Sequence, residues 1–115
     1  MKVEDLDVFK LAHDLTLKVY EITAAYPESE RFGLISQMRR ASASICMNLI
    51  EGAHRISKNE YKHFVSISRG SCGELKYQIL LSRDLGYIKD FIFREMTEAY
   101  ERISMMLTRL HSSLK

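Results

Sequence analysis

Proline and glycine are scarce in this sequence, with one and five residues respectively among 115. Turn-rich β architectures depend on both residues, so we expect a helical protein. Cys46 and Cys72 are isolated within apolar patterns and form no C-x-x-C pair, which predicts buried thiols in a reducing cytoplasm. The start, from Met1 to Asp7, is too acidic for a secretory leader. The longest strongly apolar runs are only three residues, far short of a membrane span.

The composition is that of a globular protein, with 46% hydrophobic and 28% charged residues. A chain of 115 residues has the length of one domain, and we expect residues 1–115 to form it. The net charge is only +2, but its distribution is uneven. Residues 31–73 carry seven basic and two acidic groups, so the middle third is the basic part of the chain.

Helix start and stop signals divide the chain into four segments. Apolar spacings of three and four residues predict helices over roughly 6–26, where Pro27 prevents continuation, and over 34–55. The third helix begins at the capping box Ser57-Lys-Asn-Glu60 and ends at Gly86, and the fourth covers about 89–113. Short links between four helices predict an all-α, antiparallel up-down-up-down four-helix bundle.

The apolar periodicity also predicts which side chains face the core on the last two helices. On the third helix, small residues around Ser68 should allow a neighbouring helix to approach closely. The expected inward positions there are Tyr61, Phe64, Ser68, Cys72, Leu75, Ile79 and Ser82. On the fourth helix they are Ile92, Met96, Ala99, Ile103, Met106 and Leu110.

Polar residues interrupt the apolar pattern of the second and third helices. Because the links are short, residues at equal distances from a turn lie at the same level, which places Arg40, Glu74 and Arg102 together. We therefore hypothesise a partly buried ion pair or triad of these three residues that fixes helix register. The wider network predicted around it consists of Gln37, Ser44, Asn48 and Ser71.

Several motifs taken together resemble the four-helix-bundle family named for 23S rRNA intervening sequences. The main motif reads Gln37-x-Arg39-Arg40-Ala41-x-x-Ser44-Ile45-x-x-Asn48-Leu49-x-Glu51-Gly52. It is preceded by Tyr26-Pro27-x-x-Glu30-x-Phe32-Gly33-Leu34 and followed by Gly70-Ser71-x-x-Glu74-Leu75 and Leu85-Gly86-Tyr87. The resemblance implies a small bacterial bundle whose relatives assemble as homopentamers, with no established enzymatic activity. Family genes often lie inside ribosomal RNA genes, which describes a gene location and not an RNA contact.

The residues themselves also favour assembly. Three consecutive apolar residues on a helix sweep about 200° of its surface, more than one core-facing stripe requires. Such sets occur around residues 47–50, 79–81 and 91–93, so some of their side chains should lie between subunits. The interface candidates are Met47, Ile50, Leu80 and Phe93. The competing explanation is that they are buried under loops or in a wide monomer core.

Three functional classes follow from these observations. The favoured class is a non-enzymatic homo-oligomer that binds or scaffolds protein partners. The alternative is an oligomer that binds RNA or DNA through a basic edge near the turn between the second and third helices. The residues proposed for that edge are Arg55, Lys58, Lys62 and Arg69. The competing explanation of this edge is an ordinary solvated surface.

The remote alternative is a di-metal carboxylate enzyme. Two E-x-x-H pairs occur, Glu51 with His54 and Glu60 with His63, as in di-iron helical bundles. However, the capping box already explains Glu60, and a fourth carboxylate is missing at that level. No phosphate-binding loop or nucleophile elbow is present either. We therefore predict no catalytic residue, metal ligand or cofactor.

Overall fold

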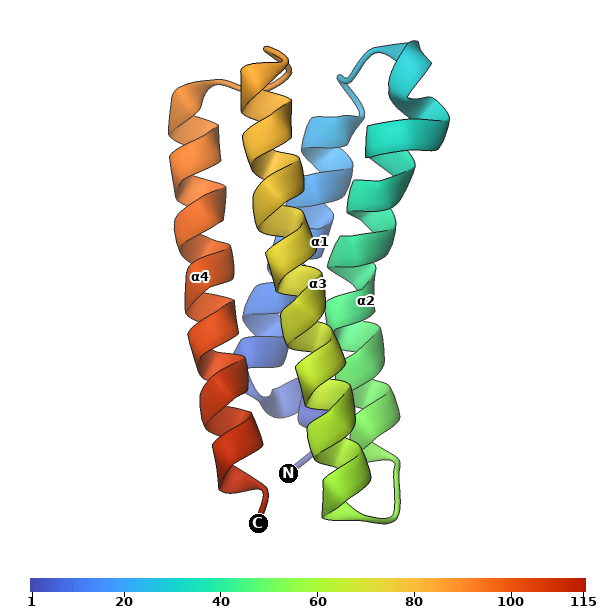
Figure 1. The fold of residues 1–115 in the computed structure, drawn as a ribbon, viewed down its shortest axis with the longest axis vertical. Coiled ribbons are helices and arrows are strands. Elements are labelled where there is room, and N and C mark those ends of the chain that lie inside the picture. Colours follow the sequence, from blue (N-terminus) through green and yellow to red (C-terminus); the bar gives the residue numbers. More distant parts are fainter.

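Four long helices run alternately up and down around a shared interior (Figure 1). The computed structural model describes residues 1–115, has no strand and measures 44 × 25 × 20 Å. The helices are α1 (Asp7–Thr23), α2 (Ser36–Ala53), α3 (Lys58–Asp84) and α4 (Asp90–Ser113). Both termini and the α2–α3 turn lie at one end, and the α1–α2 and α3–α4 connections lie at the other (Figure 1). The predicted four-helix bundle is confirmed.

Helix α1 ends earlier than the sequence predicts. It stops at Thr23, three residues before the expected end at Tyr26. A proline disfavours the helical conformation of the residue before it, here Tyr26, so the helix cannot run up to Pro27. Tyr26 is nevertheless buried and packs against Tyr87, with ring centroids 5.0 Å apart. The chain thus turns early, and Tyr26 helps to close this end of the core.

The α1–α2 connection is held to the α3–α4 connection by one carboxylate. It consists of a 3₁₀ turn (Glu28–Glu30) and a π-helical turn (Arg31–Ile35). Glu30 accepts hydrogen bonds from the Leu34 amide at 3.3 Å and from the Tyr87 hydroxyl at 2.8 Å. This hydrogen bond to Glu30 is the largest cause of a raised pKa for Tyr87, because it stabilises the protonated phenol.

The predicted signals at the two ends of α3 are confirmed. The Ser57 hydroxyl accepts a hydrogen bond from the Glu60 amide at 3.1 Å, and Glu60 accepts one from the Ser57 amide at 3.4 Å. This is the reciprocal capping box. At the other end Gly86 has φ of 81°, which glycine adopts without strain. Local sequence chemistry therefore sets both ends of the longest helix.

Small residues bring α2 and α3 close together, as the sequence predicts. The Ser68 hydroxyl is buried and donates to the carbonyl of Ile45 at 2.9 Å. A Cβ atom added to Gly52 would lie only 2.8 Å from the Cβ of Phe64. Gly52 therefore marks a close approach between these helices.

The buried stripe of α4 differs from the predicted one. Its expected members Ala99 and Met106 are only partly buried, while Tyr100 and Leu107 are completely buried. The buried positions follow the expected Ala99 and Met106 by one residue, so the core-facing stripe is rotated around the helix relative to the predicted one, although its seven-residue spacing is kept. The residues of α4 that lie in the core are Met96, Tyr100, Ile103 and Leu107.

The inward face of α3 follows the predicted pattern more closely. Ser68, Cys72, Leu75, Ile79 and Ser82 are buried as expected. Near the start of the helix, however, Val65 takes the buried position while Tyr61 and Phe64 remain partly exposed. None of the helices combines the length and apolar character needed to cross a membrane.

Candidate interaction surfaces

The buried ion pair predicted from the sequence is not formed within one chain. Arg40, Glu74 and Arg102 are all exposed, and none of them takes part in an ion pair. Residue spacing gave their level along the bundle, but it did not give their direction around each helix. On α3 the neighbouring Leu75 takes the buried direction, which turns Glu74 outward.

Part of the predicted polar network does join α2 to α3. The hydroxyl of Ser44 donates to the hydroxyl of Ser71 at 2.6 Å. The Asn48 side-chain amide donates to the Ser44 carbonyl at 2.8 Å, within its own helix. The two serines therefore form the cross-link of this network, and Asn48 supports its α2 side.

Gln37 lies at a pocket between α2 and α3, which we call the α2/α3 pocket. Its volume is about 380 Å³, and it is lined by Leu34, Gln37, Glu74, Tyr77, Gln78 and Leu81. Gln78 is only 6% exposed, yet its side-chain carbonyl oxygen has no hydrogen-bond partner. Tyr77 beside it is 62% exposed. A buried unpaired acceptor is costly, and the chain itself provides no donor to this oxygen.

Apolar and small residues are exposed further along the same two helices. Met47 on α2 is 66% exposed and Ile67 on α3 is 38% exposed. A Cβ atom added to Gly70 would meet nothing within 4 Å. We use the term α2/α3 face for the surface formed by Gln37, Arg40, Met47, Ile67, Gly70, Glu74 and Tyr77.

The four interface candidates divide into two pairs. Met47 and Ile50 are exposed, as an interface role requires. Leu80 is half-buried, and the half-buried ring of Phe93 is covered by the Arg83 guanidinium, 4.1 Å from its centroid. Leu80 and Phe93 thus have part of their surface covered within the single chain.

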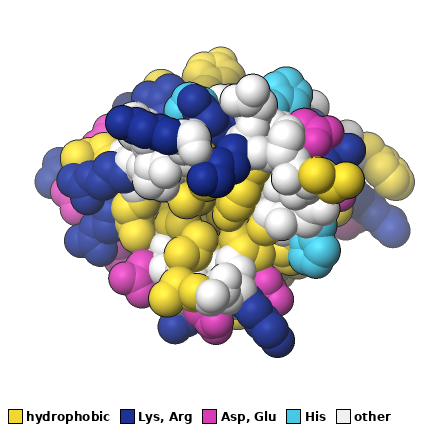
Figure 2. All heavy atoms as spheres, turned by 90° about the horizontal axis from the view of Figure 1, so that it is seen from below, with side chains coloured by type: hydrophobic (Ala, Val, Ile, Leu, Met, Phe, Trp, Pro, Cys, Tyr) yellow, Lys and Arg dark blue, Asp and Glu magenta, His cyan; other side chains and the backbone are white.

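Of the four residues predicted to form a basic edge, Arg55 is paired within the chain and the other three are not. Arg55 bonds to Glu51 at 2.7 Å, lies 3.9 Å from Glu60 and packs over the ring of Phe64. Its charge is therefore compensated locally. Lys58 and Lys62 form no ion pair. Viewed from this end, Lys and Arg side chains gather on one side of the molecule beside exposed hydrophobic atoms (Figure 2).

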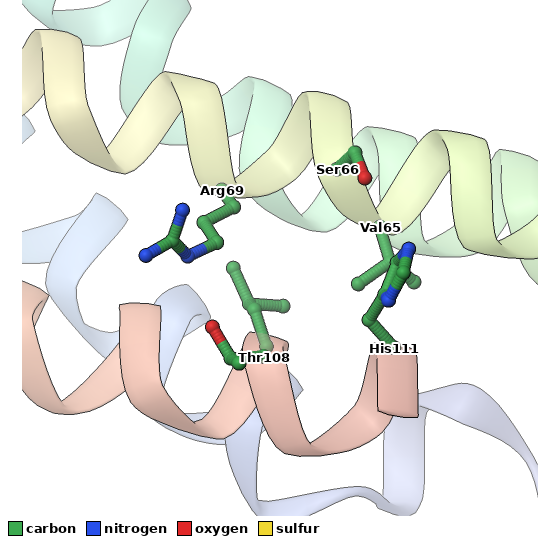
Figure 3. A pocket seen from close by; sticks show the side chains of 6 residues that line it. Val65, Ser66, Arg69, Thr108 and His111 are labelled. Carbon is green, nitrogen blue, oxygen red and sulfur yellow. The ribbon is translucent and has the colours of Figure 1, made fainter. Parts of the chain in front are cut away.

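Arg69, the fourth of these residues, belongs to a groove between α3 and α4. Two adjoining pockets make up this α3/α4 groove, with volumes of about 310 and about 500 Å³. Arg69 extends from α3 into the smaller pocket, and Thr108 and His111 extend from α4 (Figure 3). The larger pocket is lined by Arg69, Lys76, Glu101, Ser104, Met105, Thr108 and Arg109.

Sequence reasoning missed Lys76, Arg109 and His111 as members of this groove. They come from two helices that lie far apart in the chain. One signal was nevertheless present, because Lys62, Arg69 and Lys76 recur every seven residues. This spacing places them on one flank of α3, and in the structure two of them, Arg69 and Lys76, line the groove beside α4.

The residues of the two E-x-x-H pairs have other contacts. Glu51 bonds to Arg55, and Glu60 caps α3. The imidazole of His54 contacts the carbonyl of Ile50 at 2.9 Å. His, Cys, Asp and Glu side chains form no group of three or more that could hold a metal ion. In this structure the E-x-x-H residues thus take part in local contacts of α2 and α3.

The two cysteines are unpaired and poorly reactive. Burial raises the pKa of Cys46 to about 11 and that of Cys72 to about 12. Lys76 and Arg69 act in the opposite direction on Cys72, but burial outweighs them. Since the thiolate is the nucleophile, neither residue has the chemistry of a catalytic cysteine near neutral pH.

The fold and these surfaces define an antiparallel four-helix bundle whose distinctive features lie on its outer faces. The chain belongs to the family of 23S rRNA-intervening sequence proteins, whose pattern matches residues 4–109. This confirms the family resemblance found in the sequence motifs.

A solved structure has the same fold. It is a protein of unknown function from the S23 ribosomal protein family of Bacteroides thetaiotaomicron, with a TM-score of 0.82. The match covers 91% of this chain and 95% of that chain at 17% sequence identity, which establishes the fold alone. No curated protein matches the chain.

Proposed function

We propose that this chain is a non-enzymatic homo-oligomer, with five subunits as the family resemblance implies, and that it serves as a binding or scaffold module for protein partners. The observation that carries the proposal is the α2/α3 face. It combines exposed apolar side chains with an adjoining pocket where the buried carbonyl oxygen of Gln78 has no partner. Exposed apolar surface is unfavourable in an isolated subunit and becomes favourable when a second protein surface covers it.

Gly70 supports the same interpretation. Glycine in the middle of a helix costs about 1 kcal/mol relative to alanine. Within the chain nothing requires glycine there, because an added Cβ would meet open space. Glycine has a purpose at such a position when another backbone approaches closely.

The charges on this face also suit contact between copies. Arg40 and Glu74 are exposed, of opposite sign and unpaired within the chain. An arginine side chain from another copy can pair with the exposed carboxylate of Glu74. The ion pair expected from the sequence is then replaced by one between subunits.

Sedimentation analysis tests the assembly. We expect a species several times heavier than the 13.4 kDa subunit, and a wild-type protein that sediments as a monomer would overturn the proposal. Gly70→Gln should dissociate the assembly while stabilising the subunit helix. The control, Ser112→Gln, places the same side chain at an exposed site on α4 and should leave the assembly intact. Dissociation by Ser112→Gln with an intact Gly70→Gln assembly would reject the α2/α3 face.

A further inference from the structure

We infer that the α3/α4 groove binds the phosphate backbone of a nucleic-acid strand. Its first element is the row formed by Lys62, Arg69 and Lys76. Seven residues correspond to nearly two helical turns and a rise of about 10 Å, so the row runs for about 21 Å along one flank of α3. The same spacing reaches Arg83 one step further along the helix.

The first three cations of this row are uncompensated, in contrast to Arg83, which ends the row. Arg83 lies 3.1 Å from Asp84 and 3.7 Å from Asp90. Lys62, Arg69 and Lys76 form no ion pair. The positive charge available to a ligand therefore covers the groove and stops at Arg83.

Helix α4 contributes one more cation and the single acidic residue of the groove. Arg109 lines the larger pocket and is also unpaired. Glu101 is the single acidic residue in either pocket, and it lies beyond ion-pair distance of these cations.

Hydroxyl and imidazole groups complete the walls of the groove. Thr108 already donates to the carbonyl of Ser104 at 3.0 Å. The hydroxyls of Ser66 and Ser104 make no hydrogen bond within the chain, and His111 lies across from Val65 at the end of the smaller pocket (Figure 3). The hydroxyls of Ser66 and Ser104 and the imidazole of His111 can donate to phosphate oxygens between the cations.

The geometry favours a strand over a single small anion. Cations about 10 Å apart along the helix cannot converge on one phosphate, but they can contact successive phosphates of an extended chain. Arg69 and Thr108 line both pockets, so the groove is continuous. No aromatic side chain apart from the His111 imidazole lines it, so bases have little to stack on. Recognition should therefore be independent of base sequence and strongly dependent on salt.

The test measures fluorescence anisotropy of labelled oligouridylate and oligothymidylate strands as a function of salt. The variant carries Arg69→Gln and Lys76→Gln together. The matched control carries Lys10→Gln and Lys18→Gln on α1, which removes the same net charge outside the groove. Circular dichroism of both variants checks that the helices are retained.

We expect the groove variant to bind both strands at least tenfold more weakly and the control less than twofold more weakly. Each phosphate contact on a single strand contributes about 0.7 to the slope of log K against log salt, so the slope should fall by about 1.4 in the groove variant. Equal losses in the two variants would overturn the inference. So would binding to phosphatidylserine vesicles or inorganic phosphate without binding to either strand.

This inference is independent of the proposed assembly, because the groove and the α2/α3 face lie on different flanks of α3. Sedimentation of the same samples separates the two. A wild-type monomer that binds strands through the groove would reject only the assembly. An oligomer that binds neither strand would reject only the groove.

Discussion

The two flanks of α3 make opposite kinds of contact. Toward α2, the seam is closed by Gly52 and by the serine hydroxyls that reach across it. Toward α4, long side chains such as Arg69 and Lys76 border open pockets. Where small residues face each other the α2–α3 seam is closed, and it opens only further along, at the α2/α3 pocket.

The largest expected effect concerns the core beneath the α3/α4 groove. Leu107 is completely buried below the groove, while Leu110 is only partly buried. Leu107→Ala should cost about 3 kcal/mol of unfolding free energy, and Leu110→Ala about half as much. Urea denaturation of both variants provides the measurement. Equal losses of unfolding free energy would show that Leu110 contributes to the core as much as Leu107, as the stripe expected from the sequence requires.

The next prediction tests the closed seam. Gly52→Ala places a Cβ atom 2.8 Å from that of Phe64, so the helices must shift despite the better helix propensity of alanine. We expect a net loss of about 2 kcal/mol in unfolding free energy. Gly73→Ala is the matched control, and it should stabilise the subunit by up to about 1 kcal/mol, because its Cβ meets open space. The comparison fails if the two variants change stability in the same direction.

A smaller effect is expected for the serine cross-link in the same seam. Ser44→Ala and Ser71→Ala each remove one partner of the 2.6 Å hydrogen bond. Because both variants break the same bond, a double-mutant cycle should show a coupling of about 1 kcal/mol. A coupling near zero in chemical denaturation would show that this bond does not stabilise the seam.

The last prediction concerns Cys72, which lies between the two seams. Its pKa is raised to about 12 in the folded chain, so folding favours the protonated thiol. This contribution to stability is complete below the ordinary pKa of 9.0 and is lost as pH rises from there toward about 12. Cys72→Ala should flatten the loss of stability over that range in thermal melts. An unchanged pH dependence would contradict the assignment.

The comparison also explains what the sequence could and could not predict. The capping box at Ser57 and the stop at Gly86 are local signals, and both were predicted correctly. The level of Glu74 along the bundle could be calculated, but its outward direction depends on which neighbour occupies the core. The compensation of Arg55 was readable from its spacing of four residues from Glu51.

The groove illustrates a different limit. Arg69 was identified as a candidate from local charge alone. Its partners Arg109 and His111 come from another helix, and only the packing of α3 against α4 brings them near Arg69. Sequence spacing described one wall of the groove and could not supply the other.

The two ends of the bundle differ in how they should open. Glu30 bonds both to the amide of Leu34 and to the hydroxyl of Tyr87, so one carboxylate joins two connections distant in the chain. At the opposite end the α3 capping box involves only neighbouring residues. Amide hydrogens around the Glu30 end should therefore exchange as one cooperative unit, while the α2–α3 turn should fray on its own.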